Sequence, residues 1–100
     1  MDLTGAIKRI IQTGQVQYGV KTAQKAITMG KAKLIILSSD CPKRLRQNME
    51  KNSKIAQIPI VNYSGTSLEL GETCGKPFLV SNLTVLDSGA VNLSELVRKE

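Results

Sequence analysis

The sequence lacks histidine and tryptophan altogether, and it has only two cysteines. Without histidine, the usual general base of Ser-His and Cys-His nucleophilic catalysis is missing. Two cysteines without histidine cannot form a common structural zinc site, and Cys41 and Cys74 are too far apart for a Cys-x-x-Cys redox motif. The composition therefore disfavours an enzyme, and we expect neither a bound metal nor a cofactor.

Long hydrophobic runs are also missing. The longest aliphatic run covers residues 34–37, far short of the roughly 20 residues that a membrane-spanning helix needs. The first fourteen residues mix apolar side chains with Lys8, Arg9 and Gln12, which is unlike the core of a signal peptide. We therefore expect no membrane-spanning helix, a cytoplasmic location, and cysteines that stay free thiols.

Negative charge is scarce in the first half of the chain. Residues 1–54 carry eleven of the fourteen Lys and Arg residues but only Asp2, Asp40 and Glu50 as acids, a local charge of +8. Residues 55–100 sum to −2, and the whole chain carries +6. Such a surplus attracts polyanions or an anionic membrane face, and its sign alone does not choose between them.

The residues that are present suffice for one compact core. The 100 residues, 41% of them hydrophobic, fit a single domain spanning 1–100. The conformation of residues 90–100 stays open between strand, helix or both. Apolar periodicity, glycines and prolines predict helices at about 3–13, 21–29, 42–56 and 66–74, and strands at about 16–18, 33–38, 58–61 and 78–86.

Two helix starts carry local capping signals. Ser39 and Asp40 are good N-cap residues for the helix that follows them. Thr66 and Glu69 fit a capping box, in which the hydroxyl and the carboxylate each accept a hydrogen bond from a backbone amide. Glu69 and Glu72 could be paired catalytic carboxylates, but the capping role of Glu69 favours a structural reading of both.

Helices that alternate with strands through short connections predict the α/β class, as a three-layer α/β/α sandwich around a small mixed β-sheet of about four strands. The wholly apolar strand at 33–38 should be central and covered by helices on both faces. Loops that follow parallel strands gather at the carboxyl edge of a sheet, where such folds bind ligands. Three loops qualify, at 19–22, 38–42 and 62–66, and the turn at 76–78 joins them if the last strand runs antiparallel.

The turn at 19–22 has the features of an anion site. Gly19 lets another backbone approach closely, and the start of the following helix offers unpaired amides with partial positive charge. Lys21 and Lys25, one helical turn apart, would extend this site. The alternative is an ordinary turn glycine beside two solvated lysines.

Phe78 is the only phenylalanine, and it directly follows the turn Gly75-Lys76-Pro77. A ring at a loop tip can stack on an unpaired base, a contact worth roughly 1–3 kcal/mol per base. Basic loops with one exposed ring suit splayed RNA bases better than duplex DNA, since the chain shows no recognition-helix or zinc-finger pattern. The alternative is a core phenylalanine at the start of a strand.

Two other functions compete with RNA binding. Cys41 could be a reactive thiolate at a helix start near Lys43 and Arg44, which would suit a cytoplasmic enzyme for phosphate or redox chemistry. A half-buried cysteine is more common at such a turn, and Asp40 would oppose thiolate formation. The acidic second half could instead belong to a protein-interaction module, although no motif specifies its partner.

Four segments, in their order and spacing, resemble one known family. They are 19–22 (GVKT), 30–36 (GKAKLII), 65–71 (GTSLELG) and 75–78 (GKPF). Over about residues 1–88 the chain resembles the L-thirty-e family of archaeal and eukaryotic large-subunit ribosomal proteins. Their superfamily binds kink-turns, which are sharply bent RNA internal loops with sheared G·A pairs.

The resemblance implies the same sandwich, no catalytic activity, and a kink-turn of large-subunit rRNA as the partner. Neighbouring ribosomal proteins would be further contacts, and the protein would be a monomer away from the ribosome. Gly19 and Lys21 match positions where the family approaches the RNA backbone, and Phe78 matches a position where a ring stacks on an extruded base. The candidate RNA-binding residues are Gly19, Val20, Lys21, Thr22, Lys25, Ser39, Lys76 and Phe78.

One position departs from the family pattern. The family often has asparagine where this chain has Asp40. An ionised carboxylate cannot donate a hydrogen bond and repels phosphate. We therefore expect Asp40 to cap a helix rather than to contact a base.

Overall fold

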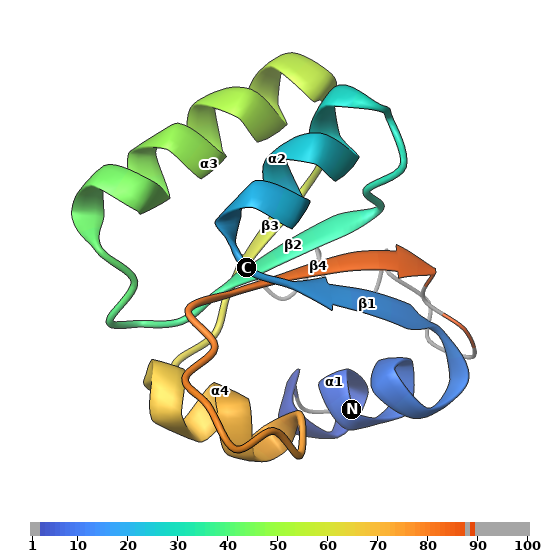
Figure 1. Ribbon diagram of the computed structural model, residues 1–100, viewed down its shortest axis with the longest axis vertical. Coiled ribbons are helices and arrows are strands. Elements are labelled where there is room, and N and C mark those ends of the chain that lie inside the picture. Colours follow the sequence, from blue (N-terminus) through green and yellow to red (C-terminus); the bar gives the residue numbers. More distant parts are fainter. Residues whose placement is uncertain (1–2, 88, 90–100) are drawn as a thin grey trace.

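Helices and strands alternate along the chain in the computed structural model, which describes residues 3–87 and residue 89 apart from the side chains of Leu3 and Val20. Every helix and strand expected from the sequence is present, in the expected order. The tail at 90–100 lies outside the described residues. In chain order the elements are α1 (Leu3–Thr13), β1 (Gln15–Tyr18), α2 (Val20–Thr28), β2 (Leu34–Leu37), α3 (Lys43–Ala56), β3 (Ile60–Asn62), α4 (Ser67–Thr73) and β4 (Asn82–Asp87) (Figure 1).

β4 lies inside the sheet, in the order β1-β4-β2-β3. It runs antiparallel to β1 and to β2, whereas β2 and β3 are parallel. β1, β2 and β3 therefore point the same way, and their carboxyl ends meet the amino end of β4 at one side of the sheet. We call this side the loop edge; it consists of residues 19–22, 38–42, 62–66 and 76–81.

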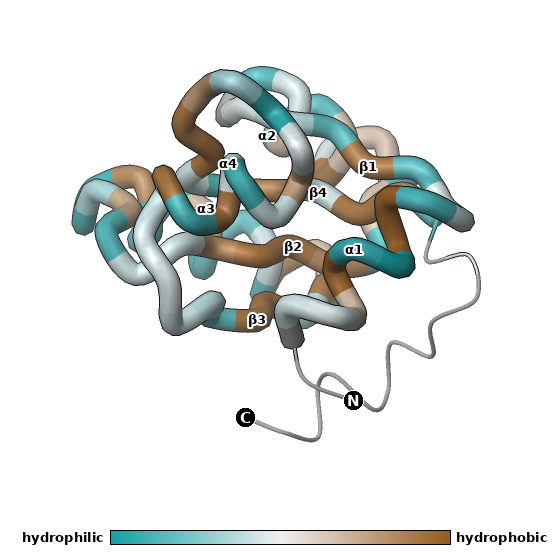
Figure 2. The backbone as a smooth tube through the Cα atoms, turned by 90° about the horizontal axis from the view of Figure 1, so that it is seen from below, coloured by the Kyte–Doolittle hydropathy of each residue, from teal (hydrophilic) through white to brown (hydrophobic). Residues whose placement is uncertain are grey.

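Helices cover both faces of the sheet, which confirms the three-layer sandwich. α1 and α4 lie on one face, and α2 and α3 lie on the other (Figure 1). β2 is buried at every position: Leu34 and Ile36 pack with α1 and α4, and Ile35 and Leu37 pack with α2 and α3. Figure 2 shows this hydrophobic strand in the middle of the molecule. A strand covered on both faces has no polar alternation, which is why the apolar run predicted its central place.

The capping box at the start of α4 is confirmed. The Thr66 hydroxyl accepts a hydrogen bond from the Glu69 N–H at 3.2 Å, and the Glu69 carboxylate accepts one from the Thr66 N–H at 3.3 Å. Both amides would otherwise lack a partner within the helix. Glu69 therefore has the structural role that the sequence predicts.

β4 is shorter than predicted, because it starts at Asn82 rather than at Phe78. Residues 78–81 run beside α4 instead, where the Val80 N–H donates to the Ser67 carbonyl at 3.0 Å. α4 approaches this segment with its backbone, since a Cβ added at Gly71 would lie 2.3 Å from the Phe78 carbonyl oxygen. Phe78 consequently lies in a loop.

β3 spans Ile60–Asn62 and not the predicted 58–61. The Ile58 N–H donates to the Ser53 carbonyl at the end of α3 at 2.8 Å, and Pro59 has no N–H to donate. Neither residue can therefore pair through its amide within the sheet. The strand begins one residue after the proline.

The predicted N-cap of α3 is wrong. α3 begins at Lys43, its N-cap is Pro42, and no side chain caps it. Ser39 and Asp40 lie too early in the loop to reach the first amides of this helix. The carboxylate of Asp40 is used elsewhere, at α4.

Replacing Gly71 by alanine tests the close contact between α4 and the segment before β4. We expect the free energy of unfolding to fall by about 1–3 kcal/mol, because the new methyl group meets a backbone carbonyl that cannot move aside cheaply. Urea denaturation measures this loss. Leu68→Ala, at an exposed position of the same helix, should change it by less than about 0.5 kcal/mol. Equal stability of Gly71→Ala and the unchanged protein would contradict the contact.

Candidate nucleic-acid interface

The loop edge brings together most of the candidate residues. Residues 19–22 form the turn into α2, Ser39 follows β2, and Lys76 and Phe78 precede β4. Neighbouring strands are about 4.8 Å apart, so the turn after β1 and the loop after β2 are roughly 10 Å apart, with β4 between them. Lys25 lies one turn further along α2, on the wall of a separate groove. Thus the predicted convergence of the loops is confirmed, with Lys25 outside it.

The turn after β1 leaves the start of α2 accessible. Gly19 has a φ of 99°, in the left-handed region that favours glycine, and among the described residues no atom beyond its two chain neighbours lies within 4 Å of the place where a Cβ would be. Gly19 is also the N-cap of α2, and it supplies no side-chain hydrogen bond. The first amides of α2 therefore remain available to a ligand, and Lys21 is exposed beside them. Such a helix start suits a phosphate group.

Phe78 and Tyr18 form an aromatic pair at the loop edge. Their ring centroids are 5.9 Å apart at an interplanar angle of 84°, an edge-to-face contact. The Lys76 ammonium lies 5.4 Å from the centroid of the Tyr18 ring, within the range of a cation–π contact. Phe78 is 50% exposed, so it is not a core residue. Its ring therefore contacts Tyr18 and still keeps exposed surface on which a base can stack.

A cavity of about 330 Å³ lies between the turn after β1 and the segment before β4. Gly19 and Phe78 both line it, and so does Asn82, which is 2% exposed. Among the described residues, nothing forms a hydrogen bond with the Asn82 Oδ1. A buried acceptor without a partner costs about 1–3 kcal/mol. Asn82 belongs to the wall of the cavity, but its Oδ1 is too deeply buried for a ligand in the cavity to reach it.

Arg46 joins the ends of β2 and β3. Its guanidinium donates to the Ser38 carbonyl at 2.5 Å and to the side-chain oxygen of Asn62. The Ser39 N–H donates to the Gly65 carbonyl at 2.9 Å, which links the two loops directly. A planar guanidinium with two partners fixes their relative orientation. The loops after β2 and β3 therefore form one rigid part of the loop edge.

Asp40 caps α4 and not α3. Its Oδ1 accepts hydrogen bonds from the Ser38 hydroxyl at 2.8 Å and the Ser67 N–H at 2.7 Å, and its Oδ2 accepts one from the Ser67 hydroxyl at 2.9 Å. These hydrogen bonds from Ser38 and Ser67 hold the pKa of the Asp40 carboxyl below its ordinary value. Two accepting oxygens are needed here, which explains why a carboxylate fits this position.

The surroundings of Cys41 disfavour a reactive thiolate. It is buried, and burial raises the pKa of its thiol; Asp40 adds to this effect, and Arg46 only partly opposes it. A nucleophilic cysteine needs a lowered pKa and an accessible sulfur. The enzymatic alternative therefore has no support at Cys41. The described residues contain no cluster of three or more cysteines and acids that could hold a metal ion.

Three residues of this interface were not predicted: Tyr18, Arg46 and Asn82. Arg46 belongs to a row of basic residues on α3 that looks uniformly solvated in the sequence, and only the packing of α3 against the strand ends selects it. Asn82 had a visible signal, because it is a polar residue inside an otherwise largely apolar segment. Tyr18 has the alternation of a strand residue, and nothing local shows that Phe78 lies against it.

A small basic α/β/α sandwich with an open helix start, an exposed ring and basic loops at one edge has the features of an RNA-binding protein. The chain belongs to the Ribosomal protein L7Ae/L30e/S12e/Gadd45 family, whose model matches residues 1–94. The RNA-binding class inferred from the residues and the family shown by comparison therefore agree.

Archaeal relatives match the chain along nearly its whole length. It is 42% identical over 100 residues to the large ribosomal subunit protein eL30 of Methanocaldococcus jannaschii, covering 100% of this chain and 91% of that protein. It is 38% identical to the eL30 protein of Methanopyrus kandleri, with 93% and 85% covered, and 33% identical to that of Saccharolobus solfataricus, with 95% and 88% covered. These relatives are named as ribosomal proteins and not as enzymes. Within residues 3–87, no helix has the length and apolar character to cross a membrane.

The lowered pKa of Asp40 makes stability depend on pH. A carboxyl whose pKa is lower in the folded chain stabilises the fold above its unfolded pKa of about 3.9, and this stabilisation is lost as the pH falls through the folded pKa. We therefore expect Asp40→Ala to have a lower Tm than the unchanged protein at pH 7. The difference should shrink as the pH falls below about 4, as thermal unfolding at a series of pH values would show. A constant difference down to the acid limit would contradict this role of the charge.

Proposed function

We propose that this protein is a constituent of the large ribosomal subunit that binds a kink-turn of large-subunit rRNA through the loop edge. It acts as one RNA-binding domain in the cytoplasm, as a monomer away from the ribosome, and it can contact neighbouring ribosomal proteins there. Its membership of the family and the names of its archaeal relatives support the ribosomal role. The geometry of the loop edge supports the kink-turn as the ligand.

One observation carries the proposal: the open start of α2 and the exposed ring of Phe78 lie on one cavity. Gly19 and Phe78 both line this cavity, which has a volume of about 330 Å³. A kink-turn presents a sharply bent backbone together with unpaired bases, so a protein that binds it needs an anion site and a stacking surface close together. The loop edge has both within the span of one cavity.

The anion site consists of the first amides of α2 and of Lys21. The amides carry partial positive charge and approach a phosphate closely, because Gly19 has no side chain in the way. The exposed Lys21 adds a full charge at the same place. Val20 and Thr22 contribute through their position in this first turn of the helix.

The base site consists of the exposed Phe78 ring and the cavity beside it. An extruded base would stack on the exposed surface of the Phe78 ring. Tyr18 contacts the Phe78 ring in an edge-to-face pair, and the Lys76 ammonium lies over the Tyr18 ring. Ser39, exposed on the same edge, would hydrogen-bond a phosphate or a ribose.

A gel-shift comparison of three RNAs tests the function. The RNAs are a kink-turn, the same sequence with its G·A pairs replaced by Watson–Crick pairs, and a plain duplex of equal length. We expect a discrete complex with the kink-turn alone at moderate salt, because only the bent loop presents splayed bases together with a closely packed backbone. Equal binding of all three RNAs would mean that the protein binds polyanions without specificity, and it would overturn the kink-turn assignment.

Phe78→Ala and Lys21→Ala should weaken kink-turn binding in two distinguishable ways. Loss of the ring should cost about 1–3 kcal/mol, with an unchanged slope of log K against log salt. Loss of the lysine should reduce that slope by about 0.9, because one fewer counterion is released. Lys54→Ala, an exposed lysine near the end of α3 that is remote from the loop edge, is the control and should leave the slope unchanged. Full affinity of Phe78→Ala would remove base stacking from the proposal.

A further inference from the structure

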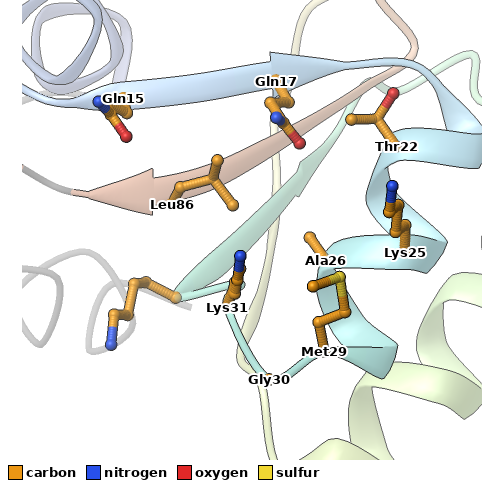
Figure 3. A pocket seen from close by; sticks show the side chains of 10 residues that line it. Gln15, Gln17, Thr22, Lys25, Ala26, Met29, Gly30, Lys31 and Leu86 are labelled. Carbon is orange, nitrogen blue, oxygen red and sulfur yellow. The ribbon is translucent and has the colours of Figure 1, made fainter.

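A groove of about 690 Å³ runs beside α2, outside the loop edge. Gln15 and Gln17 of β1 form one wall (Figure 3). Lys25 of α2 and Lys31 of the following turn lie across from them, and Leu86 of β4 lies between the two walls. The function proposed above does not use this surface.

The groove exists because none of the helices in the described part of the chain lies over one face of β1. Val16 and Tyr18 pack toward α1 and α4, so the alternation of the strand places Gln15 and Gln17 on the α2 side, where both are exposed. α2 packs over the inner strands of the sheet. Its small residue Ala26 belongs to the core on this face. The groove lies between this edge strand and α2. Its polar wall is visible in the sequence as glutamine in alternation with apolar residues.

The charge of the groove is uniformly positive. Lys25, Lys31 and Lys33 line it and are exposed, and none of the described residues that line it is acidic. Asp87 follows Leu86 in β4 and pairs with Gln15 across a β-bulge, but it is not among the residues that line the groove, and its carboxylate accepts a hydrogen bond from the Gly89 N–H at 2.9 Å. The lysine charges in the groove are therefore not compensated within it.

The groove continues from the proposed anion site. Lys25 lies one turn beyond Lys21 on α2, and Thr22 belongs both to the turn after β1 and to the groove lining. The nine residues of α2 cover about 13 Å at 1.5 Å per residue, and Lys31 and Lys33 lie beyond its end. An RNA strand held at the start of α2 can therefore pass along the whole groove.

We propose that this groove binds the sugar–phosphate backbone of the RNA stem that flanks the kink-turn, a second RNA contact that rests on the proposed function. The lysines neutralise phosphates, and the glutamine amides hydrogen-bond phosphate oxygens or 2′-hydroxyls. These contacts depend on no base, so they add affinity and orient the stem without adding sequence specificity. A protein partner fits less well, because the centres of protein interfaces are depleted in lysine.

The test measures the binding of four proteins to a short kink-turn RNA and to the same RNA with each stem extended in turn. The proteins are the unchanged chain, the groove variant Lys31→Ala/Lys33→Ala, the charge-preserving variant Lys31→Arg/Lys33→Arg, and the control Lys51→Ala/Lys54→Ala. The control removes the same charge from exposed positions of α3 that do not line the groove. All substituted lysines are exposed, so each variant should fold.

We expect the unchanged chain to bind one extended RNA more tightly than the short RNA. The groove variant should lose this gain, on the order of tenfold, and its salt slope on that RNA should fall by about 1.8 for two lost phosphate contacts. It should bind the short RNA nearly as the unchanged chain does, and the arginine variant should keep the gain. The control should bind every RNA like the unchanged chain.

The two proposals fail in different ways. If neither stem extension strengthens binding, or if the control loses as much as the groove variant, the groove is not a stem-binding site, and the kink-turn site is unaffected. If the groove variant binds the extended RNA as tightly as the unchanged chain, the groove proposal is again overturned. Failure of the unchanged chain to bind the short kink-turn overturns the proposed function, and the groove proposal with it.

Discussion

The antiparallel insertion of β4 between β1 and β2 is the constraint on which the remaining structure depends. Because β4 pairs with both neighbours, β1 and β2 run in the same direction without touching, and the start of β4 lies between their ends. Three strand ends and one strand start thus meet at a single edge. The cavity between Gly19 and Phe78 lies where the chain enters β4 beside the end of β1. Without this pairing the anion site and the aromatic ring would belong to unrelated surfaces.

Polar contacts hold the loop edge in shape where hydrophobic packing ends. Arg46 joins the ends of β2 and β3, and Asp40 ties the loop after β2 to the first residue of α4. α4 in turn holds the segment before β4. The Ser67 carbonyl accepts a hydrogen bond from the Val80 N–H, and Gly71, which has no side chain, lets the Phe78 carbonyl approach closely. The loops are therefore connected to one another before any ligand arrives. Such preorganisation lowers the entropic cost of binding a bent RNA.

α2 has two faces with separate tasks. Ala23, Ala26 and Ile27 are buried against the sheet and α3, which anchors the helix. Its start presents amides and Lys21 to the loop edge, and its flank presents Lys25 to the groove along β1. A short helix can thereby direct an RNA from a specific contact at its start toward a non-specific contact along its side. The exposed glutamines of the edge strand form the opposite wall of this groove.

Much of the fold was predictable because its signals are local. The apolar run of β2 reflects burial on both faces, and the capping box of α4 closes within four residues. Gly19 and Phe78 also stood out locally, one before a helix and the other after a turn. Boundaries were less predictable: β4 starts late because Gly71 of another element packs against Phe78. A pattern within 78–86 contains no information about that contact.

Patterns along the chain were enough to establish the order of helices and strands, the central place of β2 and the positive charge of the first half. These follow from side-chain periodicity and composition, which act over a few residues or over the whole chain. Tertiary structure alone decided that Asp40 caps a helix 27 residues away, that Cys41 is buried with a raised pKa, and that Arg46 braces two strand ends. It also decided which lysines line a groove together. Such roles depend on distances between residues far apart in the chain, and those distances exist only once the sheet has assembled around β4.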